Sequence, residues 1–208
     1  MAFLSAPKFI TEKFRTEPPK DKSEYIYIMP QRLVVQTSEH EAYNDDMIKC
    51  VTAFCCGMIE GEVFIPYDFP VTVDSVAKKY GFKCSRLTFE DRDREKLCPM
   101  TDIYYRALYL LLYMTQNEVT FSDIAKKLPF FTSRRREIEV SANKAAIMHT
   151  LSEGKGRELV EGVKIRENRG TVLIIPKKTK NAFSICAESA DSETAAELCD
   201  FYAKKLKK

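Results

Sequence analysis

No run of apolar residues in this sequence reaches membrane-spanning length, and the segment from Met1 to Lys20 lacks the apolar core of a secretory signal peptide. The sequence also contains no internal repeat and no low-complexity tract. What remains is an ordinary globular composition, since 45% of the 208 residues are hydrophobic and 30% are charged. We therefore expect a cytoplasmic protein without a membrane partner.

Cysteine is present, but not in the pattern of a disulfide framework or a zinc site. The seven cysteines are odd in number, and none forms a C-x-x-C pair. Most lie within apolar runs, so we expect reduced thiols that pack as small apolar side chains. Histidine is scarce: His40 and His149 are far apart in the sequence. No serine or cysteine has an evident partner base, so nucleophilic catalysis has no support.

The net charge of +3 is too small to indicate a nucleic-acid partner, but it is unevenly distributed. Residues 126–208 carry 18 lysines and arginines against 11 acidic residues, whereas residues 1–125 carry 15 against 19. This C-terminal basic excess favours a small anionic ligand. The cluster from Arg134 to Arg136 has no interleaved aromatic residues, so it favours the start of a basic strand over a nucleic-acid contact.

The first half of the chain shows the pattern of a parallel α/β unit. The predicted elements are strands at Tyr25–Met29 and Arg32–Gln36, a helix at Asp45–Met58, a strand at Glu62–Ile65, a helix at Phe69–Tyr80 and a strand at Phe82–Leu87. Asn44 or Asp45 is the expected N-cap of the first helix, and Gly81 is expected to end the second. The alternation of helix and strand with short connections indicates a small parallel sheet.

The second half has a different pattern. The predicted elements are helices at Thr101–Met114 and Thr120–Leu128, a strand at Glu137–Ser141, a helix at Asn143–Ser152, strands at Glu161–Arg166, Thr171–Ile175 and Ala182–Glu188, and a helix at Ser192–Lys208 with Ser192 as N-cap. The order from the first of these strands predicts an antiparallel sheet with two helices on one face. We expect an arm at 1–24, a partial α/β domain at 25–98, a helical connector at 99–130 and a C-terminal domain at 131–208.

The run from Glu161 to Tyr202 reads EGVKIRENRGTVLIIPKKTKNAFSICAESADSETAAELCDFY. It resembles the last domain of the α-D-phosphohexomutases, which shows a DGVK segment, a hairpin, a proline-led loop, a strand ending in Glu-Ala, and a helix. Upstream, Glu62–Pro70 and Ala77–Phe82 resemble part of the family's third domain, and Ser122–Pro129 resembles its approach to the last domain. The variety most similar in pattern is the phosphomannomutase-like half of proteins with a sugar-phosphate nucleotidyltransferase domain in front.

The resemblance implies a mixed fold of the α/β and α+β classes. A small parallel α/β unit is expected first, followed by an antiparallel sheet of the TATA-box-protein type with two helices on one face. It also implies a relation to intramolecular phosphotransferases that use magnesium.

The groups that perform the mutase reaction are absent from this sequence. No stretch matches the family's phosphoserine segment, its Asp-Gly-Asp-Gly-Asp-Arg magnesium loop or its sugar-selecting Gly-Glu-Glu-Ser-Gly loop. The run from Asp91 to Arg94 lacks the glycines that let three carboxylates converge on one cation. We therefore expect no catalytic residue, metal site or cofactor in this chain, with magnesium needed only in a complete family member. The isolated chain is expected to be inactive.

One loop matches the family's phosphate site in position. The family uses an Arg-Pro-Ser-Gly-Thr-Glu-Pro loop, and the matching residues here run from Ile175 to Asn181. The residues that the resemblance implies for phosphate binding are Lys177, Lys178, Thr179 and Lys180. Ile175 replaces the arginine and Lys178 replaces the glycine, so the lysines would act as point charges without an amide cradle. A solvated, lysine-rich turn is the alternative.

Two functions are compatible with these features. The first is the C-terminal, non-catalytic portion of a phosphomannomutase- or phosphoglucomutase-like protein in sugar-phosphate and nucleotide-sugar metabolism, which binds the phosphate of a hexose phosphate. The alternative is a degenerate mutase-like docking or regulatory module with no ligand site. The expected partners are a hexose phosphate, preceding catalytic or nucleotidyltransferase domains of a longer protein, and further copies of the chain.

Overall fold

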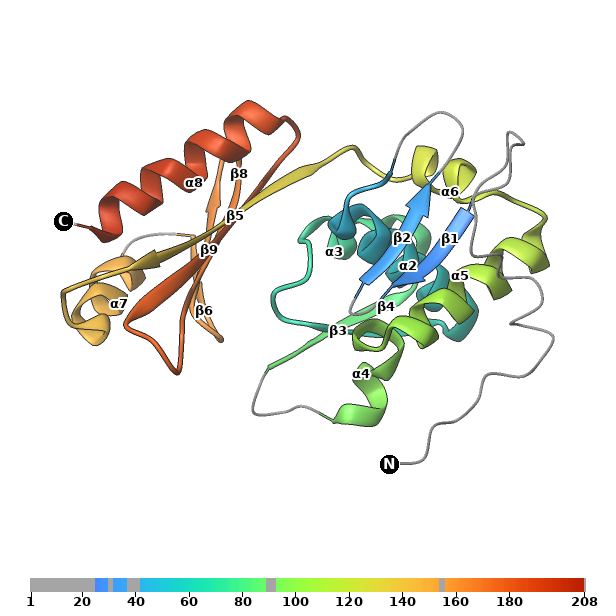
Figure 1. Cartoon of the computed structure of the whole chain (residues 1–208), viewed down its shortest axis with the longest axis horizontal. Helices are drawn as coiled ribbons and strands as arrows, with labels where there is room; N and C mark the ends of the chain where they lie inside the picture. Colours follow the sequence, from blue (N-terminus) through green and yellow to red (C-terminus); the bar gives the residue numbers. More distant parts are fainter. Residues whose placement is uncertain (1–24, 30–31, 37–41, 89–92, 154–155, 208) are drawn as a thin grey trace.

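The structure is a computed structural model that describes residues 25–29, 32–36, 42–88, 93–153 and 156–207. Two groups of elements lie side by side, each around its own hydrophobic cluster (Figure 1). We call residues 25–131 the N-terminal module and residues 132–207 the C-terminal module. The predicted arm at 1–24 lies outside the described residues, and the predicted division into domains stays a prediction. Within the described ranges, no helix is long and apolar enough to span a membrane.

The N-terminal module is built on one central helix. Its elements are β1 (Tyr25–Met29), β2 (Arg32–Gln36), α2 (Asp45–Glu60), β3 (Glu62–Pro66), α3 (Thr72–Tyr80), β4 (Lys83–Leu87), α4 (Arg94–Thr101), α5 (Ile103–Asn117) and α6 (Phe121–Lys127). Strands β1 and β2 pair in antiparallel fashion, and β3 and β4 pair in parallel. Helix α2 packs against β2 of the first pair, against β3 of the second pair, and against α3 and α5. It therefore lies at the centre of the N-terminal module.

Local sequence explains where α2 begins and what it buries. The Asn44 side chain accepts a hydrogen bond from the Met47 N–H at 2.7 Å, and Gly61 ends the helix with a φ of 74°. Phe54, which is 2% exposed, makes edge-on contacts with rings from other elements of the module. One of these rings, Phe82, lies so close that a Cβ atom on Gly57 would overlap it.

The C-terminal module is an antiparallel sheet with both of its helices on one face. Its elements are β5 (Thr132–Glu139), α7 (Lys144–Ser152), β6 (Arg157–Leu159), β7 (Val163–Glu167), β8 (Gly170–Pro176), β9 (Ala182–Ser189) and α8 (Ser192–Leu206). The strand order is β5-β9-β8-β7-β6. Leu151 of α7 and Leu198 and Tyr202 of α8 belong to the same buried cluster as the inward-facing strand residues. The predicted fold class is therefore confirmed.

Several predicted boundaries differ from the structure. Strand β6 was not predicted, because its three residues are too few to show an alternation. The strand expected from Glu137 already begins at Thr132, since pairing with β9 extends through the arginine cluster. The cap of α8 is Asp191 rather than Ser192: the Asp191 carboxylate accepts a hydrogen bond from the Thr194 N–H at 2.7 Å. Helix α3 begins at Thr72 rather than at Phe69.

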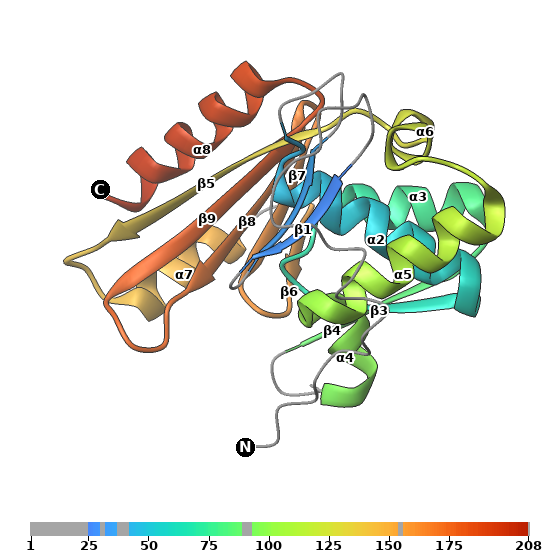
Figure 2. The ribbon, with the colours of Figure 1, turned by 45° about the vertical axis from the view of Figure 1, so that its right-hand side comes forward.

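The second face of the sheet points toward the N-terminal module. Side chains alternate between the two faces of a strand, so buried Ile165 and Ile185 face the helices while Lys164 and Glu188 face the other way. Figure 2 shows α8 on one side of the sheet and the N-terminal module on the other. We call the contact between the two modules the seam.

Candidate functional site

The four residues expected to bind phosphate lie together in the connection between β8 and β9. The Lys177 N–H donates a hydrogen bond to the Ala182 carbonyl at 2.9 Å, which closes the hairpin. Lys178, Thr179 and Lys180 are exposed. The hairpin therefore gathers these side chains at a solvent-facing tip, which we call the basic loop (Lys177–Asn181).

The backbone of the basic loop is held from neighbouring elements. The Lys144 ammonium, at the start of α7, donates hydrogen bonds to the carbonyls of Lys177 and Lys180 at 2.8 and 2.9 Å. Asn181 and Val140 exchange hydrogen bonds at 2.6 and 2.9 Å. Lys144 was not predicted to belong to the site. Its ammonium group holds the loop in place through two backbone carbonyl oxygens.

A carboxylate, also not predicted, lies against the basic loop. Glu137 on β5 forms ion pairs with Lys177 at 3.2 Å and with Lys180 at 3.6 Å. The bond from Lys177 is the main reason that the pKa of the Glu137 carboxyl lies below its usual value. Two lysines thus converge on one anionic group. An incoming phosphate has to compete with Glu137 or bind beside it.

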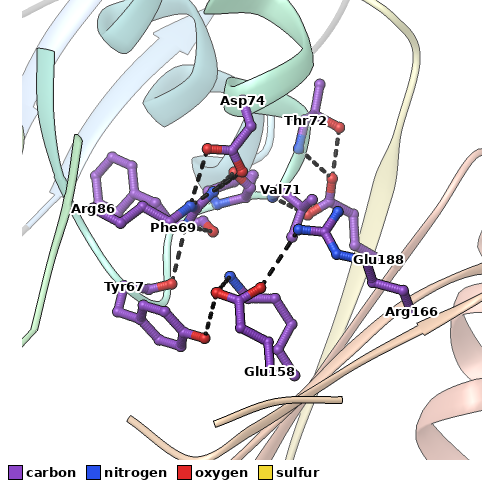
Figure 3. Close-up of polar contacts among 11 residues, drawn as sticks. Tyr67, Phe69, Val71, Thr72, Asp74, Arg86, Glu158, Arg166 and Glu188 are labelled. Atoms are coloured by element: carbon purple, nitrogen blue, oxygen red, sulfur yellow. Dashed lines mark hydrogen bonds and ion pairs between the residues drawn. The ribbon is translucent and has the colours of Figure 1, made fainter. Parts of the chain in front are cut away.

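Glu188 makes the principal polar contact across the seam (Figure 3). It lies near the end of β9, and its carboxylate accepts hydrogen bonds from the N–H groups of Val71 and Thr72 at 2.6 and 2.8 Å. The Thr72 hydroxyl donates a third bond at 2.5 Å. Val71 is the N-cap of α3 and offers no side-chain cap. The first turn of α3 is therefore capped by a carboxylate from the other module.

Arg86 fixes the turn that presents those N–H groups. Its guanidinium donates to the carbonyls of Tyr67, Phe69 and Pro70 at 2.9, 2.9 and 2.8 Å. It also binds both carboxylate oxygens of Asp74 at 3.1 and 3.2 Å through Nε. The Pro70 carbonyl accepts from this guanidinium and also from the Val73 N–H at 3.3 Å. These bonds hold the residues from Tyr67 to Pro70 in a turn, and α3 begins after it at Thr72. Figure 3 shows the turn arranged around Arg86.

A second set of polar contacts joins the two modules at Tyr67. The Tyr67 hydroxyl donates to Glu158 at 3.1 Å, and the Lys164 ammonium lies 4.1 Å from the centre of the Tyr67 ring. The Lys164 side chain is 2% exposed and lies 3.8 Å from Glu158. Burial, together with nearby Arg86, lowers the pKa of the Lys164 amine. A buried lysine with these partners ties the sheet to the turn of the N-terminal module.

The seam is packed rather than open. The Ser133 hydroxyl donates to the Asp46 carboxylate, and Arg135 binds the same carboxylate at 3.1 Å. The cavity between the modules, lined in part by these residues and by Glu188, measures about 10 Å³. That is room for a single water molecule. The seam therefore positions the two modules, and this cavity between described residues is too small for a hexose phosphate.

The Asp46 contacts predict a pH dependence of stability. Burial alone would raise the pKa of the Asp46 carboxyl, but Arg135, Ser133 and Lys49 outweigh this effect and hold the pKa below its ordinary value. Such a group stabilises the fold above its unfolded-state pKa of about 4 and stops doing so as pH falls through the lower folded-state pKa. Asp46→Asn should therefore lower the unfolding free energy by about 1 kcal/mol at neutral pH and by progressively less as the pH falls below about 4. Urea unfolding across this pH range measures this, and a loss that does not change with pH would contradict it.

The cysteines and acidic residues offer no further chemistry in the described ranges. All seven cysteines are free, and burial raises the pKa of the Cys186 thiol to about 11 and that of Cys84 to about 12. No cluster of metal-binding side chains occurs among the described residues. Asp93 accepts a hydrogen bond from the Glu95 N–H as the cap of α4, whereas Asp91 and Arg92 lie outside the described residues. The described part of the chain does not fit the family's magnesium site.

No protein-family model matches the chain, and no curated protein sequence is significantly similar to it. Solved structures are similar in fold. A phosphoglucomutase/phosphomannomutase family protein from Burkholderia thailandensis superposes with a TM-score of 0.63 and 14% identity, covering 85% of this chain and 44% of that chain. An N-acetylglucosamine-phosphate mutase of the α-D-phosphohexomutase superfamily, in its substrate complex, gives 0.59 and 10%, covering 95% and 51%. The Aspergillus fumigatus N-acetylphosphoglucosamine mutase with GlcNAc-6P and magnesium gives 0.54 and 11%, covering 93% and 51%.

The superpositions cover most of this chain but only part of each solved structure. Nearly all of this chain is matched, yet it spans only about half the length of each mutase. Identities of 10–14% establish a shared fold and nothing finer. This chain has the fold of the C-terminal domains of the α-D-phosphohexomutases.

Proposed function

We propose that this chain is the C-terminal, non-catalytic portion of a phosphohexomutase-like protein of sugar-phosphate metabolism, and that its basic loop binds the phosphate of a hexose phosphate. One observation supports the binding role. The connection between β8 and β9 gathers Lys177, Lys178 and Lys180 at the position where the resemblance in sequence order puts the family's phosphate loop. Catalytic groups and magnesium would then belong to other domains, such as a preceding mutase or nucleotidyltransferase part.

The chemistry of the loop predicts weak binding. Lys177 and Lys180 share the single carboxylate of Glu137, so two positive charges meet one negative charge and the positive excess attracts a dianion. The ammonium groups are exposed and lack the fork geometry of arginine, so salt screens them and each contact is weak. We expect a Kd of about 1 mM that rises with ionic strength.

Isothermal titration with mannose 1-phosphate and glucose 1-phosphate tests the proposal. Lys178→Glu reverses one charge in the loop and should abolish measurable binding. Lys78→Glu makes the same charge change at an exposed position on α3 and should leave binding intact. If the wild-type chain does not bind, or if both variants lose binding equally, the basic loop is not a phosphate site.

Removing the competing carboxylate should strengthen binding. Glu137→Gln frees Lys177 and Lys180 from their ion pairs, so the affinity for glucose 1-phosphate should rise about three- to fivefold. Glu193→Gln removes an equal charge at the start of α8, close to the other end of β9, and serves as the control. An unchanged or lower affinity in Glu137→Gln would mean that phosphate does not use these lysines.

The same carboxylate favours a second candidate function. If Glu137 stays paired with Lys177 and Lys180, the loop binds no phosphate. The chain would then be a degenerate docking or regulatory module, and the packed seam would hold its two modules together. Failure of both the wild-type protein and Glu137→Gln to bind any hexose phosphate would select this alternative.

A further inference from the structure

Helix α5 presents an apolar face to solvent. The exposed hydrophobic residues of this helix, with exposed fractions from 38% to 68%, are Tyr104, Tyr105, Leu108, Leu111 and Leu112. Their spacing places them on one side of the helix. The single charged residue within α5, Arg106, is 5% exposed and lies on the buried side with Ala107 and Leu110. The exposed side, which we call the α5 face, therefore carries five apolar side chains and no charge.

The α5 face is separate from the seam. Helix α5 packs on α2, α4, β1 and β2, and both views place it away from the five-stranded sheet (Figures 1 and 2). Its exposed side chains follow one another at helical spacing, whereas a single exposed hydrophobic residue such as Phe201 on α8 is normal on a protein surface. A continuous apolar patch of this kind marks an interaction surface.

We infer that the α5 face pairs with the α5 face of a second copy of this chain, with the two helices antiparallel. The residue spacing is symmetric about Leu108: Tyr104 and Leu112 lie four residues to either side, and Tyr105 and Leu111 lie three. A twofold axis at Leu108 sets each tyrosine of one copy against a leucine of the other. The larger aromatic rings then meet smaller aliphatic side chains, as complementary packing requires, whereas parallel helices would place tyrosine against tyrosine.

The exposed apolar area of the α5 face and its lack of charge are both compatible with a second copy of the chain as the partner. Five side chains, each roughly half exposed, present on the order of 400 Å² per copy, so a pair of copies buries about 800 Å². That area is smaller than that of a stable interface and predicts a weak, reversible dimer. Because the α5 face is uncharged, two copies meet without repulsion, while a charged partner would gain nothing from it.

Sedimentation velocity over roughly 10 to 500 µM protein tests the pairing. The wild-type chain should shift from monomer to dimer with rising concentration. Leu108→Lys places two like charges at the twofold axis and should weaken dimerisation at least tenfold. Leu159→Lys is the matched control, because Leu159 on β6 is 59% exposed and Leu108 is 55% exposed. Leu112→Lys should reproduce the effect of Leu108→Lys, and circular dichroism checks that each variant is folded.

The remaining outcomes would overturn the inference. A wild-type chain that stays monomeric throughout the concentration range leaves the α5 face to another occupant, such as a preceding domain of a longer protein. A dimer that survives in both Leu108→Lys and Leu112→Lys uses a different surface.

Discussion

Replacing Arg86 with lysine should lower the free energy of unfolding by about 3 kcal/mol. The guanidinium serves three backbone carbonyls and a carboxylate at once, and its side chain is only 11% exposed. A lysine ammonium has three donors and no planar fork, so it leaves some of these buried acceptors unpaired. Each unpaired acceptor costs about 1 to 3 kcal/mol. The turn before α3 should loosen as a result.

Urea unfolding followed by far-UV circular dichroism measures this effect. Lys83→Met is the control on the same strand, because the Lys83 side chain is 71% exposed and its solvent-screened ion pair with Glu62 should add little to stability. A loss below about 1 kcal/mol for Arg86→Lys would show that the turn does not depend on the guanidinium.

Replacing Glu188 with alanine should cost about 2 kcal/mol and weaken the contact between the modules. The substitution removes all three hydrogen bonds to Val71 and Thr72 and leaves the first turn of α3 without its cap. Glu188→Gln keeps the shape of the side chain but loses the charge that favours a helix N-terminus, so it should cost about half as much. Faster hydrogen exchange at the Val71 and Thr72 amides should accompany both losses.

A double-mutant cycle separates the cap from general destabilisation. Thr72→Val removes one donor, and its coupling with Glu188→Ala should be about 1 kcal/mol. Glu197→Ala on α8 serves as the control, because Glu197 forms an exposed ion pair with Arg169 on the helix-covered side of the sheet. Additive effects of Thr72→Val and Glu188→Ala would mean that the carboxylate does not cap α3.

The extent to which the sequence predicted the fold depended on how local each signal is. Helix α2 was predicted because Asn44, a periodic apolar face and Gly61 all lie within one short segment. The hairpin between β7 and β8 was predicted for the same reason, from the Glu167–Gly170 turn. Helix α3 was predicted to begin too early because Arg86, which binds the preceding carbonyls, follows that turn by more than a dozen residues.

The candidate site follows the same rule. The position of the basic loop was predicted from a contiguous run of residues. The roles of Glu137 and Lys144 were not, because they depend on the pairing of β5 with β9 and on the placement of α7. The contact between the two modules was not predicted either. Glu188 and Thr72 are separated by 116 residues, and no sequence pattern near either residue predicts that they form a hydrogen bond.

The proposed phosphate site is tested most directly by ¹⁵N–¹H NMR titration of the chain with mannose 1-phosphate. The proposal predicts saturable shift changes confined to the basic loop and to the neighbouring amides of Glu137 and Lys144. No change up to about 10 mM ligand, or changes only along the seam, would contradict it.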